Sequence, residues 1–409
     1  MTKTVSRKIA PQPWMTAPQT RAVIDALADA RIEARFVGGC VRDALLGRSI
    51  ADIDVATPAR PEEIVAALQK ARIKTVPTGI EHGTITAVVS EPAPPKHFEI
   101  TTLRRDVETY GRRARVAFDA DWSEDAARRD FTINAIYLDP DGTVHDPVGG
   151  LADLEAHLVR FVGEPAQRIA EDVLRVLRYY RFEARFGTGK GDAAARAACR
   201  AAVPLLAKLS AERIAGELLR LLTVPDPLPT LRMMAADGVL AAIVPEAMRL
   251  DRLQRLSAFD PKPDPLRRLA ALITADAAGA AALAERLRLS NEQRARLAGL
   301  TPPWPLDPAG DARAQRLSLY RLGADRYRDL SLLSAAEGSI DEPRLRERLA
   351  LADAWQPPRF PLQGRDVTAL GIPPGKRVGE LLTAVQRWWE ASDFTANRAA
   401  CLERLKEIM

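Results

Sequence analysis

The sequence predicts an α+β protein in which a mixed β-sheet with helices occupies the N-terminal part and helices alone form the rest. Short apolar strands alternate with amphipathic helices over roughly the first 158 residues. From about residue 190 the chain is rich in Ala, Leu and Arg with helical periodicity, and Pro-rich breaks divide it into segments. We therefore expect a sheet-containing domain followed by a helical neck, body and tail, over residues 1–158, 159–225, 226–356 and 357–409.

The elements of the sheet domain are expected in close succession. An amphipathic helix with Val23, Ile24 and Leu27 on one side leads into an apolar strand. Pro61 at the first position of a later helix, with acidic residues behind it, marks a helix start. The expected helices cover 17–30, 41–46 and 61–69, and the expected strands cover 35–37, 50–56, 73–76, 83–89 and 97–102. The Pro-rich breaks of the helical part lie at 225–229, 261–265, 302–308 and 357–361.

The composition is that of a globular protein that suits a polyanionic partner. The 409 residues are 47% hydrophobic and 28% charged, with a net charge of +5 and a pI near 9.2. No apolar run approaches the ~18 residues of a membrane span, and the N-terminus lacks the apolar segment of a secretory signal. Its basic, acid-free start resembles a transit peptide as well as a flexible lead-in. Three widely spaced cysteines without a CxxC pair argue against a zinc site or disulfides and favour the cytoplasm.

A glycine pair near the N-terminus has the features of an anion-binding turn. Gly38 and Gly39 follow a short apolar strand and let the backbone approach a ligand closely, because neither has a Cβ atom. The following helix is closed by Gly47, so its free N–H groups and the positive end of its dipole point back at the glycines. Arg42 adds a cationic fork. We expect a phosphate to bind here.

Two aspartates follow on the next expected strand. Asp52 and Asp54 are two residues apart and therefore share one face of that strand. Two adjacent carboxylates are costly without a cation, and Mg²⁺ takes one or two protein carboxylates and completes its shell with water and substrate phosphate. In a two-metal arrangement such a pair can activate an attacking hydroxyl and neutralise a leaving pyrophosphate. A D-x-D pair alone also fits a solvated strand end, so the surrounding motif decides.

The ordered set GG-x-VRD-x-LLG-x(4)-D-x-D-x-x-T closely resembles the opening motif of the class II tRNA CCA-adding nucleotidyltransferases and bacterial poly(A) polymerases. The resemblance implies a polymerase-β-like nucleotidyltransferase head with two Mg²⁺ ions at the aspartates and a triphosphate at the glycine turn. It covers nearly the whole chain, although only residues 36–186 contain motifs specific enough to carry residue roles. The segment PTGIEHGTITA after the aspartates is more typical of CCA-adding members than of poly(A) polymerases.

A third carboxylate and a basic segment follow. Glu99 lies on an alternating strand and faces the same way as the aspartates if the strands are neighbours, which fits the family's HFEITTLR-like strand and a role as proton acceptor. A surface glutamate fits equally well. The arginine-rich residues 104–118 have almost no apolar periodicity, which is typical of a solvated loop. The family resemblance favours instead a mobile basic flap over triphosphate or RNA.

The segment ARRDFTINAIYLD resembles the family's second motif, in which the second arginine meets the nucleotide. The resemblance implies this role for Arg129. Asp130 is either an alternative third carboxylate or the residue that orients Arg129, and Asn134 is a further candidate. An ordinary capped helix start explains Asp130 but leaves the arginine pair unexplained.

Residues 171–186 predict one helix with a stripe of arginines, Arg175, Arg178 and Arg181. Asp172 precedes Arg175 by three residues and shares its face. A ladder of ion pairs on a solvated helix is the simpler interpretation of this pattern.

A carboxylate beside a guanidinium also matches the Watson–Crick edge of C and A. Both bases present an amino donor beside a ring-nitrogen acceptor, whereas U and G present an acceptor and then a donor. Asp172 accepting from the amino group and Arg175 donating to the ring nitrogen would select CTP and ATP without a template, because wrong pairing costs ~1–3 kcal/mol. The segment resembles the EDxxR motif of the class II enzymes, with Glu171 as its first acid, and the resemblance implies that Arg178 and Arg181 lie along the nucleotide.

The sequence thus predicts a tRNA CCA-adding enzyme that uses CTP, ATP and two Mg²⁺ ions in the cytoplasm, with no membrane association and no evident protein partner. A poly(A) polymerase of the same family is the nearest alternative, and a non-catalytic tRNA-binding protein is a more distant one. The tail over residues 357–409 resembles the family's helices that hold the tRNA elbow, although a solvated helical surface has the same composition.

Overall fold

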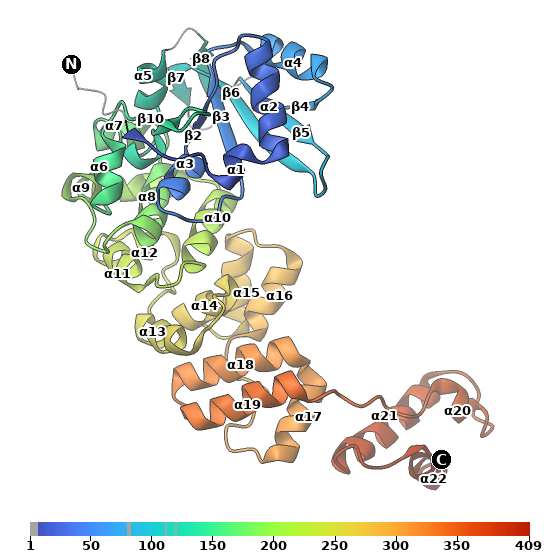
Figure 1. The fold of residues 1–409 in the computed structure, drawn as a ribbon. Helices are drawn as coiled ribbons and strands as arrows, with labels where there is room; N and C mark the ends of the chain where they lie inside the picture. Colours follow the sequence, from blue (N-terminus) through green and yellow to red (C-terminus); the bar gives the residue numbers. More distant parts are fainter. Residues whose placement is uncertain (1–6, 80–82, 111–112, 119–120) are drawn as a thin grey trace. The chain divides into compact units, whose positions relative to one another are not determined.

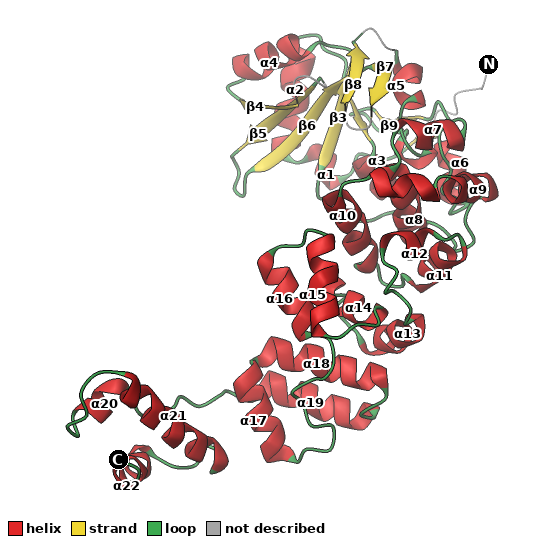
Figure 2. Ribbon diagram, turned by 180° about the vertical axis from the view of Figure 1, so that it is seen from behind, coloured by secondary structure: helices red, strands yellow, loops and turns green. Residues whose placement is uncertain are grey.

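The computed structural model describes residues 7–79, 83–110, 113–118 and 121–409. The chain forms two compact units, Met1–Pro245 and Glu246–Met409. The first contains a mixed sheet with helices, and the second consists of helices and their connections (Figures 1 and 2). The predicted α+β class is therefore confirmed, whereas the division into four domains stays a prediction. No helix in the described residues is long and apolar enough to cross a membrane.

The sheet has eight strands and one parallel pair at its centre. Its strands are β1 (Arg7–Lys8), β2 (Arg35–Val37), β3 (Ile53–Thr57), β4 (Lys74–Gly79), β5 (Thr84–Val89), β6 (Lys96–Thr102), β9 (Tyr137–Leu138) and β10 (Thr143–His145). Their order is β1-β10-β9-β2-β3-β6-β5-β4, and only β3 and β6 run parallel among these neighbours. Strands that are far apart in the sequence thus lie side by side at the centre.

Helices of the first unit surround this sheet and continue beyond it. Helices α2 and α4 contact β5, and Ala126 of α5 joins Val37, Ala56 and Tyr137 in a hydrophobic cluster on the face opposite Phe36 and Val55. The helices are α1 (Pro13–Thr16), α2 (Pro18–Asp29), α3 (Gly39–Leu45), α4 (Pro61–Lys70), α5 (Trp122–Ala127), α6 (Gly150–Glu155), α7 (Pro165–Glu171), α8 (Leu174–Phe186), α9 (Ala193–Ala201), α10 (Ala211–Leu222), α11 (Leu228–Ala236) and α12 (Val239–Ile243), with 3₁₀ turns η2 (Thr132–Asn134) and η3 (Val203–Lys208).

The elements predicted for the sheet domain are confirmed with small shifts, and two expectations are wrong. The strand expected over 50–56 begins only at Ile53, because Gly38 turns out of β2 and leaves the preceding residues without that neighbour. Of the two interpretations of residues 104–118, the solvated loop is wrong, because β7 (Arg105–Tyr110) and β8 (Arg113–Ala117) form an antiparallel pair there, whereas the basic flap stays a prediction. β-Branched and aromatic residues such as Val107 and Tyr110 favour strands and outweigh the high charge.

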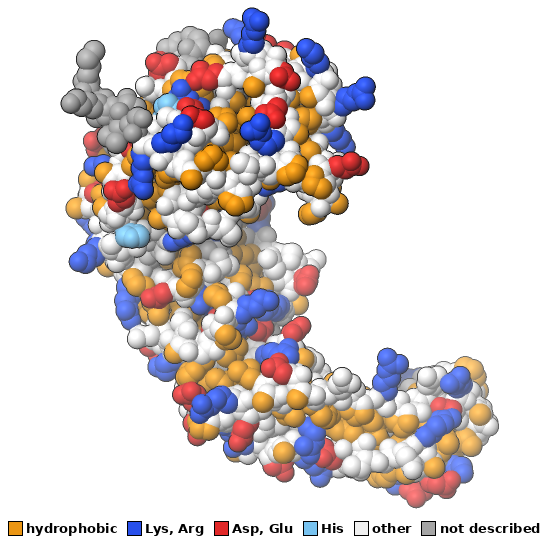
Figure 3. Space-filling model, viewed as in Figure 1, with side chains coloured by type: hydrophobic (Ala, Val, Ile, Leu, Met, Phe, Trp, Pro, Cys, Tyr) orange, Lys and Arg blue, Asp and Glu red, His pale blue; other side chains and the backbone are white. Residues whose placement is uncertain are grey.

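The second unit is a series of helices. These are α13 (Leu250–Phe259), α14 (Pro265–Leu272), α15 (Ala277–Arg286), α16 (Asn291–Gly299), α17 (Ala312–Leu322), α18 (Ala324–Glu337), α19 (Glu342–Ala354), α20 (Gly364–Thr368), α21 (Lys376–Ala391) and α22 (Arg398–Glu407). Each predicted Pro-rich break falls where one helix ends and the next begins. A hydrophobic cluster around the buried Trp389 joins α20, α21 and α22. Lys and Arg are interspersed with Asp and Glu over the visible face of both units (Figure 3).

Candidate active site

Two carboxylates lie side by side at the centre of the sheet. Asp54 of β3 pairs in register with Glu99 of β6, and on its other side with Val37 of β2. Residues opposite one another on neighbouring strands project to the same face, so Asp54 and Glu99 share one face, as the alternation predicted. Asp52 precedes β3 by one residue and is exposed to solvent. Its spacing from Asp54 places it toward the same face at the strand end.

The negative charge at this end of β3 favours a cation. Partial burial and the nearby carboxylates of Glu99 and Asp52 together raise the pKa of Asp54 to about 6, although Arg129 opposes the rise. Among the described residues, no group of three or more His, Cys, Asp or Glu is gathered closely enough to hold a metal ion by itself. One or two carboxylates with substrate phosphates are what Mg²⁺ requires, so the residues fit a hard divalent cation that arrives with its substrate.

The glycine turn borders this carboxylate. Gly38 has φ +74° and ψ −128°, a conformation that glycine adopts without strain. A Cβ built on Gly38 would lie 3.7 Å from Oδ2 of Asp54 and 3.8 Å from Nη1 of Arg129. The turn, the carboxylate and the guanidinium therefore meet at one point. Helix α3 follows directly, and Gly47 after it has the positive φ, +66°, that the predicted helix end requires.

We predict that Gly38→Ala destabilises the protein by on the order of 1–3 kcal/mol, because its backbone conformation is strained for any residue with a Cβ. The midpoint of thermal unfolding measures this. Gly39→Ala is the matched control, since Gly39 lies in α3 and its Cβ would meet only Nη2 of Arg42, at an ordinary contact distance of 3.7 Å. Equal midpoints for the two variants would contradict the strain at Gly38.

Arg42 follows the turn in α3 and belongs to a chain of buried and partly buried polar groups. Its Nη1 donates to Oδ1 of Asn134 at 2.6 Å, and its Nε donates to Oδ1 of Asp43 at 2.9 Å. Asn134 in turn donates to Oδ1 of Asp130 at 3.0 Å, and Asp130 accepts from Nε of Arg178 at 2.8 Å. Only 6% of Arg42 is exposed, and burial lowers its pKa. The chain links α3, η2 and α8.

Asp130 does not orient Arg129, so this part of the prediction is wrong. Asp130 accepts from Arg178 and Asn134, and these contacts hold the pKa of its carboxyl at about 2 despite its burial. The residue that holds Arg129 is Asp125, four residues earlier, whose Oδ2 accepts from Nη2 of Arg129 at 2.9 Å. As a third carboxylate, Glu99 has the better position because it stands directly beside Asp54.

The single helix predicted over residues 171–186 is broken at Asp172. Helix α7 ends at Glu171, Asp172 has extended backbone angles, and α8 begins at Leu174. The cause is local: Oδ1 of Asp172 accepts from the N–H of Leu174 at 3.1 Å, a side-chain contact that competes with helix continuation.

Asp172 and Arg175, whose spacing would let them pair in the alternative ladder of ion pairs, each pair with another residue. Oδ2 of Asp172 accepts from Nη2 of Arg213 in α10 at 2.5 Å, whereas Nη1 of Arg175 donates to Oε2 of Glu171 at 2.5 Å. The main chains of Asp172 and Arg175 still meet, since the N–H of Arg175 donates to the carbonyl of Asp172 at 3.0 Å. The acid and the base are neighbours without being partners, so each is available to a ligand only in competition with its present partner.

Arg178 and Arg181, the other arginines of the stripe, are also engaged. Arg178 pairs with Asp130, and Nε of Arg181 donates to Oε2 of the buried Glu217 in α10 at 2.5 Å. Asp43, Asp125, Tyr137, Arg213 and Glu217 were not predicted from the sequence. Two of them had a readable signal, since Asp43 adjoins its partner Arg42 and Asp125 precedes its partner Arg129 by four residues. Tyr137, Arg213 and Glu217 reach their partners through the tertiary fold.

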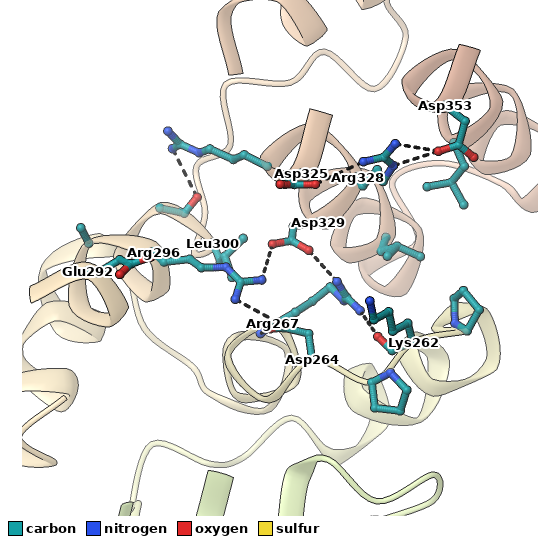
Figure 4. Close-up of a pocket in the computed structure, with 17 residues that line it drawn as sticks. Lys262, Asp264, Arg267, Glu292, Arg296, Leu300, Asp325, Arg328, Asp329 and Asp353 are labelled. Carbon is teal, nitrogen blue, oxygen red and sulfur yellow. Dashed lines mark hydrogen bonds and ion pairs between the residues drawn. The ribbon is translucent and has the colours of Figure 1, made fainter. Parts of the chain in front are cut away.

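A cavity of about 910 Å³ lies in the second unit, lined by residues of α14, α16, α18 and α19 (Figure 4). Arg267 donates to Asp329 at 2.6 Å, and Arg296 donates to Asp264 and Asp329 at 2.9 and 2.8 Å. These charges pair with one another across the cavity wall. The neighbouring carboxylates of Asp54 and Glu99 in the first unit repel one another, so they are the stronger candidate for a catalytic site.

Comparison with known proteins identifies the class of protein to which this chain belongs. A family model described as the poly A polymerase head domain matches residues 34–160, and one described as a probable RNA and SrmB-binding site of polymerase A matches residues 192–250. The crystal structure of the Bacillus stearothermophilus CCA-adding enzyme in complex with CTP superposes with a TM-score of 0.77 at 29% identity, over 95% of this chain and 96% of that one. The fold and the carboxylate pair of Asp54 and Glu99 are those of a nucleotidyltransferase, a class that generally uses divalent metal ions.

Two relatives narrow the class. The mitochondrial CCA tRNA nucleotidyltransferase 1 of Mus musculus is 34% identical over 406 residues, which cover 95% of this chain and 89% of that protein. The CCA-adding enzyme of Lacticaseibacillus paracasei is 33% identical over 398 residues, which cover 91% and 92%. The chain belongs to the family of CCA tRNA nucleotidyltransferases.

Proposed function

We propose that the chain adds C, C and A to the 3′ end of tRNA from CTP and ATP, without a nucleic-acid template and with release of pyrophosphate. The observation that carries this proposal is the in-register pair Asp54 and Glu99 beside the Gly38 turn. It occurs in a chain that belongs to the family of CCA tRNA nucleotidyltransferases. We also propose a cytoplasmic location, which suits the three free and buried cysteines.

The reaction joins the 3′-hydroxyl oxygen of tRNA to the α-phosphorus of the nucleotide and breaks the bond from that phosphorus to pyrophosphate. Glu99 accepts the proton of the attacking hydroxyl, since it lies on the same face as Asp54 and next to it. Asp52 and Asp54 would hold two Mg²⁺ ions, which when bound supply activation of the hydroxyl and neutralise charge on the phosphates.

The triphosphate binds where backbone and positive charge meet. Gly38 and Gly39 leave room for the phosphates because neither has a Cβ, and Arg129 points its free Nη1 toward the same place. Arg42 contributes charge from below, with Nη2 3.7 Å from where a Cβ of Gly39 would be. In this proposal these groups meet the triphosphate, which CTP and ATP share, so they serve both nucleotides alike.

The base is chosen by Asp172 and Arg175. Their donor and acceptor pattern complements C and A. When a nucleotide binds, its base edge replaces Arg213 as the partner of Asp172 and Glu171 as the partner of Arg175. Arg178 and Arg181 lie farther along α8, and their pairing with Asp130 and Glu217 suits a role in shaping the nucleotide site rather than in direct contact.

The test uses purified protein and Mg²⁺ with tRNA transcripts lacking all of the terminal CCA, lacking only the final A, or complete. Each nucleoside triphosphate is supplied alone and all together, and products are resolved at single-nucleotide length. Addition that stops at CCA supports the proposal. A long adenosine tract on unrelated RNA would mean a poly(A) polymerase, which the match to a poly A polymerase head domain keeps as the second candidate. Binding of tRNA without incorporation would mean a non-catalytic protein.

A further inference from the structure

Asp125 in α5 is a buried carboxylate whose two oxygens are both fully engaged. Its side chain is 1% exposed. Oδ1 accepts from Nε and Nη2 of Arg128 at 2.8 and 2.5 Å, and Oδ2 accepts from Nη2 of Arg129 at 2.9 Å and from the hydroxyl of Tyr137 at 2.7 Å. A buried carboxylate is costly unless such partners surround it, and the two guanidiniums hold its pKa at about 2.

One edge of the Arg129 guanidinium is hydrogen-bonded to Asp125, and the other edge faces the Gly38 turn. Nε and Nη2 face Asp125, at 3.2 and 2.9 Å from Oδ2. Nη1 has no hydrogen-bond partner among the described residues, and it lies 3.8 Å from the point where a Cβ of Gly38 would be. Oδ2 of Asp54 lies 3.7 Å from the same point. Because the guanidinium is planar and rigid, fixing one edge fixes the direction of the other.

Tyr137 connects Asp125 and Arg129 to the sheet, because it contacts both and lies in a strand. It lies in β9 and pairs in register with Val37 of β2, which pairs in register with Asp54 on its other side. Tyr137 and Asp54 therefore project from the same face of the sheet, two strands apart. The ring of Tyr137 also lies against the guanidinium of Arg129, 5.4 Å from its centre. Arg129 is thus contacted by Asp125 of helix α5 on one side and by Tyr137 of strand β9 on the other.

We propose that Asp125 and Tyr137 are positioning residues that hold Arg129 with its Nη1 edge at the Gly38 turn, ready for the triphosphate of the incoming nucleotide. The inference rests on the proposed function, in which Arg129 contacts the nucleotide. A long arginine side chain loses freedom when it binds a ligand, and a side chain that is already held loses less. The arrangement acts through the phosphates, so its effect is the same for CTP and ATP.

The test measures steady-state kinetics of the full chain with Asp125→Asn and with Tyr137→Phe. Asp125→Asn is expected to raise KM for CTP and for ATP by about 10-fold each, and Tyr137→Phe by about 3-fold. KM for tRNA and the preference for CTP over UTP are expected to stay unchanged. Tyr137→Phe removes one hydroxyl, so it decides the question if Asp125→Asn does not fold.

The matched control is Asp121→Ala. Asp121 caps the same helix, α5, by accepting from the N–H groups of Ser123 and Glu124 at 2.9 and 2.8 Å, and it makes no contact with Arg129. The control loosens α5 and is expected to leave KM for both nucleotides unchanged. An equal rise in KM for Asp121→Ala would overturn the inference, because the effect would then come from the helix.

The double variant Asp125→Asn with Arg129→Ala separates this inference from the proposed function. If Asp125 acts through Arg129, the double variant has the same KM as Arg129→Ala alone. A further rise in the double variant would overturn the positioning role while leaving the role of Arg129 intact. An unchanged KM in Arg129→Ala itself would remove Arg129 from the nucleotide site and contradict both the positioning inference and the role of Arg129, while leaving CCA addition untouched.

Discussion

Replacing Asp54 by Asn is expected to abolish nucleotide addition while making the protein more stable in the absence of divalent cations. The loss of activity follows from the removal of a carboxylate that we propose as a metal ligand, and about a thousandfold or more is expected. The gain in stability follows from relief of charge: Asp54 is partly buried beside Glu99 and near Asp52, and its pKa is raised to about 6. Removing the ionised group stabilises the fold by on the order of 1–3 kcal/mol.

The pH dependence has a definite sign. The pKa of about 6 in the folded state lies above the ordinary value of 3.8, so the folded protein binds this proton more tightly than the unfolded chain. Stability contributed by protonated Asp54 is present below about pH 4 and is lost as pH rises through 6. The midpoint of thermal unfolding should therefore differ most between Asp54→Asn and the unchanged protein above pH 6, and the difference should close toward pH 4.

Asp52→Asn is the matched comparison. Asp52 is exposed to solvent, so its replacement is expected to reduce activity without raising the unfolding midpoint. Added Mg²⁺ should raise the midpoint of the unchanged protein and leave that of Asp54→Asn nearly where it was. A midpoint for Asp54→Asn at or below that of the unchanged protein, in the absence of cations above pH 6, would contradict the charge repulsion at this site.

Asp172→Asn is expected to lower kcat/KM for CTP and ATP by about 10- to 100-fold and to narrow the preference for CTP over UTP. A carboxylate only accepts hydrogen bonds, whereas an amide can turn its NH₂ group toward the exocyclic oxygen of uracil, so the rejection of that base weakens. Single-nucleotide incorporation with each triphosphate measures both effects.

A control for this variant removes an aspartate that only caps a helix. Asp192 accepts from the N–H of Ala195 at 2.8 Å at the start of α9, and Asn is an equally good cap. Asp192→Asn should therefore leave both kcat/KM and base preference unchanged. If Asp172→Asn kept the full preference for CTP and ATP over UTP, the base would have to be read by other residues.

Local patterns in the sequence predicted the carboxylate pair and the glycine turn well. The alternation that put Asp54 and Glu99 on one face needed only the period of a strand, and the parallel pairing of β3 and β6 then brought them together. The glycine turn and the positive φ at Gly47 were likewise predicted from the conformational freedom of glycine.

Partner choice among charged residues was not predictable from sequence spacing. Asp172 and Arg175 have the spacing of a helical pair, but a side-chain contact to Leu174 ends the helix and Arg213, 41 residues later, takes the carboxylate. Asp130 adjoins Arg129 in the sequence, yet it pairs with Arg178, 48 residues away. An arginine-rich segment reads as a loop because charge says nothing of backbone pairing, and there the strand β7 pairs with β8.

The polar chain from Arg42 through Asn134 and Asp130 to Arg178 joins the glycine turn to the helix that follows Asp172. Arg42 and Asn134 are buried, and the ion pair of Arg178 with Asp130 is partly buried. Movement of α8 relative to the Gly38 turn would have to break these contacts, so we expect the distance between the two to stay the same when a nucleotide binds. Cytosine and adenine differ by a whole ring, so in the proposed function we expect side chains at the break between α7 and α8, and not movement of α8, to accommodate the larger base.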